Sequence, residues 1–143
     1  MDIIAIVYSY KNDLDNMKLE SRNMNRLNDL KNIINILGNT LSYAENYAMM
    51  NGYQSQKKEF SEYDYYNASE KTQQKLYREK FIASISNLDN VYGYYINKYR
   101  ELPLPPSLPK KKIIDRLNSY KQAVNANDRE IYDNLIKVFY GSY

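Results

Sequence analysis

The chain has 143 residues, a formal net charge of +3, 17 tyrosines against 3 phenylalanines, and no cysteine, histidine or tryptophan. The absence of cysteine excludes disulfides, thiolate nucleophiles and cysteine-bound metal centres. The absence of histidine removes the commonest general base and the commonest metal ligand. Since this length suits one domain with a substantial core, we expect a single helical domain over residues 1–143.

The longest apolar run, Ile3 to Tyr8, is much shorter than the roughly 20 residues of a membrane span. Asp2 stands where a secretory signal carries basic residues, so we expect an intracellular protein with no membrane partner. The run itself fits either a strand or the start of a helix. Small size and a composition rich in residues with A- and T-rich codons suit a protein of a virus or mobile element.

The first half of the chain carries apolar residues at alternating steps of three and four, which is typical of a helix that packs along one seam. The spacing favours one long helix over about residues 12–51, capped by Asn12 or Asp13. Gly38-Asn39 could instead kink this helix, or end one helix and start another. The Asn51-Gly52 pair is predicted to end it. The seam consists of Leu27, Leu30, Ile34, Leu37, Leu41, Ala44 and Ala48.

A second seam predicts a helix over about residues 69–100, with Ser69 as its cap, after a polar loop over residues 53–68. This seam consists of Phe81, Ile85, Leu88, Tyr92, Tyr95 and Tyr99. Two antiparallel helices with matched seams form a helical hairpin. All four prolines fall within residues 103–109, which predicts an extended, semi-rigid linker.

Two shorter helices are expected after the linker. One places Ile113, Leu117, Tyr120 and Val124 on a single face, and Pro109 fits its first turn. The other is predicted to be capped by Asn127 and to end before Gly141, with an apolar face formed by Ile131, Leu135, Val138 and Phe139. The predicted fold is therefore all-α, a helical bundle built on the hairpin of residues 12–51 and 69–100 plus two C-terminal helices.

Familiar catalytic patterns are missing from the sequence, including Gly-rich phosphate loops, metal-binding spacings and nucleophile elbows. We therefore expect a protein that is not an enzyme and that has no cofactor, metal or small-molecule substrate. The leading hypothesis is a non-catalytic helical interaction protein that binds another macromolecule, in the first place a protein. The seams can also pair between chains, so a homodimer is one expected arrangement.

Excess tyrosine supports this hypothesis, because tyrosine is enriched in protein interfaces. Four tyrosines are candidate interface residues: Tyr63, Tyr65 and Tyr66 in the polar loop, and Tyr94, which lies off the second seam. Tyr92, Tyr95 and Tyr99 are expected in the core instead.

The alternative hypothesis is a nucleic-acid-binding or coat-like protein that uses a basic face over residues 110–121. Lysine and arginine neutralise phosphates, and tyrosine rings stack on unpaired bases. The candidate residues are Lys110, Lys111, Lys112, Arg116, Tyr120 and Lys121. A solubilising surface is the simpler explanation of the same charges.

The order of helices and the stretch Leu135 to Gly141 resemble the small, all-helical subunit of type III CRISPR effector complexes. The resemblance implies a protein that lines bound RNA with basic residues. It covers only a few residues, and the final helix is shorter here than in that family. No site residue is therefore carried over from it.

Overall fold

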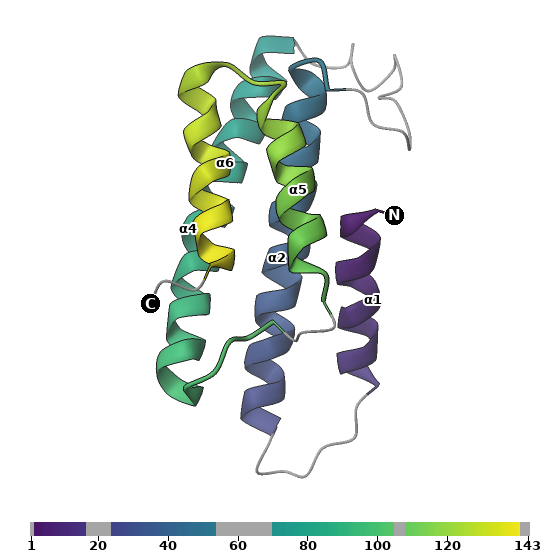
Figure 1. Ribbon diagram of the computed structural model, residues 1–143, viewed down its shortest axis with the longest axis vertical. Coiled ribbons are helices and arrows are strands. Elements are labelled where there is room, and N and C mark those ends of the chain that lie inside the picture. Colours follow the sequence, from purple (N-terminus) through teal and green to yellow (C-terminus); the bar gives the residue numbers. More distant parts are fainter. Residues whose placement is uncertain (1, 17–23, 54–69, 105–107, 141–143) are drawn as a thin grey trace.

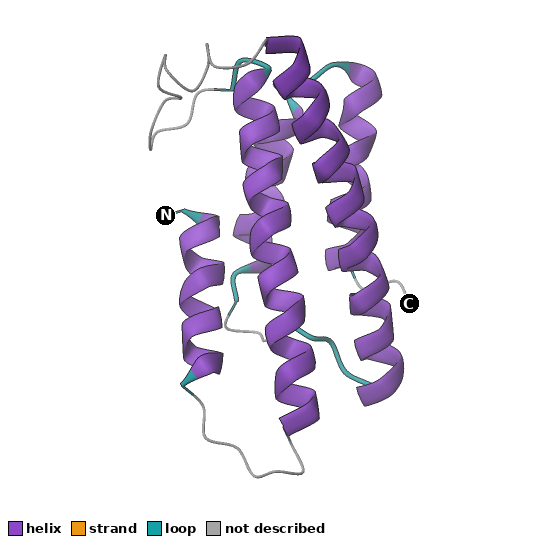
Figure 2. Cartoon of the chain, turned by 180° about the vertical axis from the view of Figure 1, so that it is seen from behind, coloured by secondary structure: helices purple, strands orange, loops and turns teal. Residues whose placement is uncertain are grey.

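A computed structural model describes residues 2–16, 24–53, 70–104 and 108–140, which form five helices and no strand (Figures 1 and 2). The helices are α1 (Ile3–Asp15), α2 (Met24–Met50), α4 (Glu70–Tyr99), α5 (Lys110–Lys121) and α6 (Ala126–Phe139). The all-α bundle predicted from the sequence is confirmed. Its two longest helices, α2 and α4, run antiparallel and pack along the predicted seams. No helix in the described ranges is long and apolar enough to cross a membrane.

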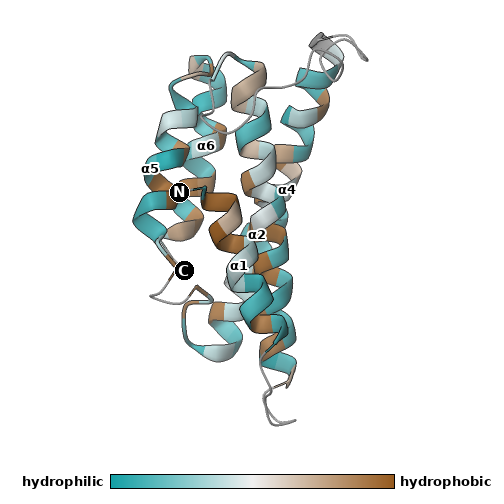
Figure 3. Cartoon of the chain, turned by 90° about the vertical axis from the view of Figure 1, so that its right-hand side faces the viewer, coloured by the Kyte–Doolittle hydropathy of each residue, from teal (hydrophilic) through white to brown (hydrophobic). Residues whose placement is uncertain are grey.

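The predicted start of the first long helix at residue 12 is wrong. Residues 3–15 form a separate helix, α1, which ends with Asn16 as its C-cap, and α2 begins only at Met24. The side chain of Asp2 caps α1 by accepting a hydrogen bond from the amide of Ile4 at 3.0 Å. The apolar run after Asp2 therefore opens a helix, and the start of α1 is brown in Figure 3.

The other predictions for α2 are confirmed. The helix continues through Gly38 and ends at Met50, and Gly52 takes a left-handed conformation with φ of 104°. The amide of Gly52 bonds to the carbonyl of Met49, and the amide of Tyr53 bonds to that of Ala48. This pair of bonds is a Schellman motif, in which glycine is favoured because it adopts positive φ without steric cost.

The segment between α4 and α5 contributes to the core rather than only spacing the helices. Leu104 and Leu108 are buried, and Pro109 is the N-cap of α5. Residues 105–107 lie outside the described ranges, so the extended linker stays a prediction there. At the start of α6 the predicted cap is wrong: Asn125, not Asn127, accepts a hydrogen bond from the amide of Asp128 at 3.0 Å.

Much of the core consists of tyrosine. Tyr47, Tyr92, Tyr95, Tyr120 and Tyr132 are all buried. Three tyrosine hydroxyls donate hydrogen bonds to α2 from the helices packed on it: Tyr99 to Asp29 at 2.6 Å, Tyr120 to Glu45 at 2.9 Å, and Tyr132 to the carbonyl of Ala44 at 2.7 Å. The excess of tyrosine over phenylalanine thus serves bonds between helices, because a phenylalanine ring has no group that donates them.

The buried tyrosines predict a loss of stability in alkaline solution. Burial raises the pKa of Tyr47, Tyr92 and Tyr95 from 10.0 to about 12. The unfolded chain releases its phenol protons near pH 10, so above that pH the native state binds more protons than the unfolded state. The free energy of unfolding should therefore be fully retained below about pH 10 and fall as the pH approaches 12. Urea denaturation followed by circular dichroism at several pH values measures this, and an unchanged midpoint across that range would contradict it.

Because α1 approaches α2 closely at Gly38, we predict that only a small side chain fits at position 38. A β-carbon on Gly38 would lie 3.3 Å from Cε1 of Tyr8, so the half-exposed ring must shift by a few tenths of an ångström. Alanine gains up to about 1 kcal/mol of helix propensity over glycine, so Gly38→Ala should be neutral or stabilising. Gly38→Leu should lower the free energy of unfolding by about 1–3 kcal/mol, because it overfills this contact. Equal effects of the two changes in chemical denaturation would refute the size limit.

Candidate functional site

The predicted basic face is divided by the fold. Tyr120 is fully buried, so the expectation that its ring stacks on a base is wrong. The ring belongs to the apolar side of α5, and its hydroxyl is bonded to Glu45. Lys121 forms an ion pair with Asp133 of α6, with Nζ and Oδ1 2.7 Å apart.

The remaining basic residues do not share one surface either. Lys112 and Arg116 border a shallow pocket of about 230 Å³ beside the start of α1, together with Asp115. Lys111 is exposed and lies about 100° round the helix from Lys112. Lys110 is half-buried at the first position of α5.

Of the four candidate interface tyrosines, one can be placed. Tyr94 is 57% exposed on α4, and the ammonium group of Lys98 lies 5.4 Å from the centre of its ring. Tyr63, Tyr65 and Tyr66 lie outside the described residues.

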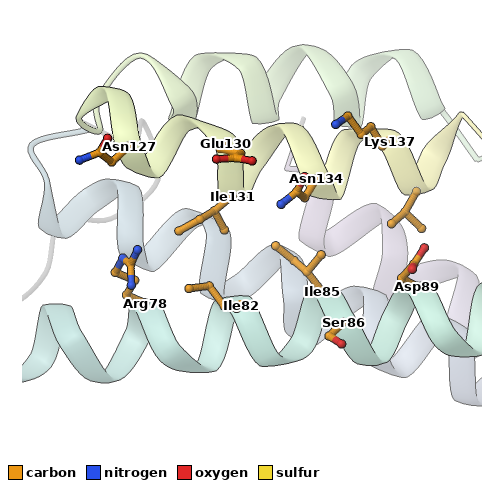
Figure 4. Close-up of a pocket in the computed structure, with 11 residues that line it drawn as sticks. Arg78, Ile82, Ile85, Ser86, Asp89, Asn127, Glu130, Ile131, Asn134 and Lys137 are labelled. Carbon is orange, nitrogen blue, oxygen red and sulfur yellow. The ribbon is translucent and has the colours of Figure 1, made fainter.

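A groove of about 630 Å³ lies between α4 and α6 (Figure 4). Its apolar floor consists of Ile82, Ile85, Ile131 and Val138, and Ile82 is 40% exposed. We call this the α4–α6 groove. Its polar rim consists of Arg78, Ser86 and Asp89 from α4 and of Asn127, Glu130, Asn134 and Lys137 from α6.

The two helices run in the same direction, so residues of α4 and α6 face each other in order along the groove. Arg78 and Asn127 lie at one end, and Asp89 and Lys137 lie toward the other (Figure 4). Ile82 and Ile85 point up toward Ile131 and Asn134 across the gap. The exposed isoleucine is therefore flanked on both sides by polar and charged groups.

A buried carboxylate fixes one end of this groove. Asp128, near the start of α6, is 5% exposed and accepts hydrogen bonds from the hydroxyl of Tyr47 at 2.5 Å and from Nε of Arg78 at 3.0 Å. These bonds join α6 to α2 and α4 together. The bond to Asp128 raises the pKa of the Arg78 guanidinium, and burial followed by the same carboxylate raises that of Tyr47 to about 12. Within the described residues no group of three or more carboxylates is placed to hold a metal ion.

Sequence reasoning missed the groove, although one signal was available. Arg78, Ile82, Ile85 and Asp89 repeat at steps of four, three and four residues, in a row that shares Ile85 with the seam that forms the core. Ile82 is the apolar residue of this row that the core does not cover. Only the placement of α6 alongside α4 turns that row into one wall of a groove.

No protein-family model matches the chain, and neither a curated protein nor a solved structure matches it. The resemblance of Leu135 to Gly141 to the CRISPR subunit has no support from these comparisons.

The Asp128 cluster gives a stability prediction. Asp128→Ala removes the acceptor of a buried hydroxyl and of a guanidinium, so it should lower the free energy of unfolding by about 2–4 kcal/mol. Tyr47→Phe removes one donor and leaves the bond to Arg78, so its cost should be about 1 kcal/mol. Chemical denaturation of both variants checks the order. A milder effect of Asp128→Ala than of Tyr47→Phe would show that the carboxylate does not organise this end of the groove.

Proposed function

We propose that this protein is a non-catalytic interaction protein and that it binds another protein in the α4–α6 groove. The observation that carries the proposal is the exposed Ile82 in the apolar floor, within a rim of charged and amide side chains. Protein interfaces share this anatomy, with an apolar centre that excludes water and a polar edge. Burying the exposed part of Ile82 contributes to the free energy of association.

The composition of the groove favours a protein over a small ligand. Seven of its eleven lining residues are polar or charged, and none is aromatic. Small-molecule sites are mainly lined by apolar and aromatic side chains around a few polar groups. A partner helix or loop also matches a groove that runs along two helices.

Nucleic-acid binding has weaker support. Of the six basic-face candidates, Tyr120 is buried and Lys121 is paired with Asp133. Lys111 and Lys112 remain exposed at the first turn of α5, where lysine opposes the helix dipole slightly. Four cations divided between two sides of one helix do not form a continuous phosphate-binding surface.

Site-specific photocrosslinking tests the proposal. A photoreactive amino acid replaces either Ser86, which lines the groove, or Asn87, which is exposed on the other side of α4. In cells that express the protein, irradiation should give a discrete crosslinked polypeptide from position 86 and not from position 87. Mass spectrometry then identifies that polypeptide.

Two further variants serve as controls. Ile82→Glu in the position-86 protein should abolish the crosslink while helicity is unchanged, because the replaced side chain is part of the surface. Replacing Lys110, Lys111 and Lys112 by alanine should leave the crosslink intact. A position-86 adduct no stronger than that from position 87, or one that survives Ile82→Glu, would refute protein binding in the groove.

A further inference from the structure

The charges around the α4–α6 groove are self-complementary, and we propose that its occupant is a second copy of this chain. In this dimer, α4 packs antiparallel on α4 and α6 antiparallel on α6. The inference rests on the proposed function, because it names the protein that fills the same groove.

The row of residues on α4 has the same spacing in both directions, with opposite charges at its two ends. Arg78, Ile82, Ile85 and Asp89 are separated by four, three and four residues. When a second α4 runs antiparallel about the midpoint of this row, Ile82 faces Ile85 of the second copy and Arg78 faces its Asp89. Spacing of this kind forms the seam of helix pairs, in which apolar side chains meet at the centre.

The wall contributed by α6 has the same property with the charges reversed. Glu130 and Lys137 are two turns apart, with Asn134 between them, and all three are exposed. In Figure 4, Glu130 lies near the level of Ile82, and Lys137 lies between the levels of Ile85 and Asp89. A single twofold axis across both helices therefore sets Glu130 opposite Lys137 of the second copy, and Asn134 near its own counterpart.

The rim thus carries four charges that alternate in sign around the groove. Arg78 of α4 and Glu130 of α6 lie in one half of the groove, while Asp89 of α4 and Lys137 of α6 lie in the other half. A twofold axis lying in the interface makes such a pattern its own complement, as an isologous dimer requires. Complementary charges of this kind fix register and partner choice, while Ile82, which is 40% exposed, provides the apolar contact.

The bonds within one copy leave donors for this contact. Arg78 uses Nε to hold Asp128, and its side chain is 44% exposed. A guanidinium carries five N–H donors, so its terminal nitrogens remain able to bond a carboxylate of the second copy. One arginine can therefore anchor α6 and pair across the interface.

A second twofold axis, parallel to the helices, also pairs opposite charges but matches the floor poorly. It would set α4 on α6 of the second copy at the same level, with Ile82 near Ile131 but with Ile85 against Asn134. An apolar side chain facing an amide loses the hydrophobic contact and leaves the amide without a partner. The antiparallel α4–α4 arrangement instead sets Ile82 opposite Ile85 on both sides of the axis and no isoleucine opposite an amide.

Sedimentation equilibrium of the full chain over a range of concentrations tests the inference. The unmodified protein should form dimers, and Ile82→Glu should raise the dissociation constant by on the order of tenfold or more. Glu130→Lys should weaken the dimer similarly. The new lysine at position 130 of each copy would face Lys137 of the other copy, which places two like-charged pairs in the interface. Asp13→Lys on α1 makes the same charge change at an exposed site outside the groove and should have no effect.

A charge exchange tests the orientation. Glu130→Lys combined with Lys137→Glu restores opposite charges between the two α6 helices, so the double variant should dimerise better than Glu130→Lys alone. The parallel arrangement predicts the reverse, since the exchanged residues would then face Arg78 and Asp89. A double variant weaker than the single one overturns the proposal.

The remaining outcomes separate this inference from protein binding in general. A protein that is monomeric at every concentration, or a dimer insensitive to both Ile82→Glu and Glu130→Lys, overturns the self-association. If position 86 still crosslinks to a different polypeptide, protein binding in the groove stands and only the identity of the occupant is wrong. Crosslinks between copies of the chain from position 86 support both proposals.

Discussion

The structure depends on one requirement: polar tyrosine hydroxyls close to the core need hydrogen-bond partners. A buried hydroxyl without a partner costs more free energy than its bond contributes when made. The bonds that meet this requirement converge on α2. They join it to α4 through Tyr99 and Asp29, to α5 through Tyr120 and Glu45, and to α6 through Tyr132 and Ala44. α2 is therefore the helix against which the positions of the later helices are set.

The α4–α6 groove follows from that arrangement. α6 is bonded to α2 through Tyr132 and through the Tyr47–Asp128 pair, and its polar bond to α4 is the one between Asp128 and Arg78 at one end. α4 in turn packs mainly on α2. α6 packs mainly on α5 and less extensively on α4, and the groove with Ile82 lies between α4 and α6.

The sequence predicted those features that repeat within one helix. The seams of α2 and α4 and the glycine stop after Met50 are encoded in local spacing, and all are present. Helix boundaries that depend on polar residues were predicted less well. Asn12 and Asp13 are typical helix caps but lie near the end of α1. Asn125 and Asn127 are both suitable caps for α6, and the structure uses Asn125. The groove was out of reach because its walls are 38 or more residues apart, from Asp89 to Asn127, and only the parallel placement of α4 and α6 brings Ile82 near Ile131.

The distance along the chain between the bonded partners has a consequence for biosynthesis. The partners of Tyr120, Asp128 and Tyr132 on α2 lie 75, 81 and 88 residues earlier in the chain. While the ribosome is still making α4, the acceptors on α2 have no tyrosine to meet them, and its apolar surface is covered on few sides. Contacts of such long range slow folding and prolong exposure to aggregation. The side chains that cover and bond α2 are thus all present only when α6 has left the exit tunnel.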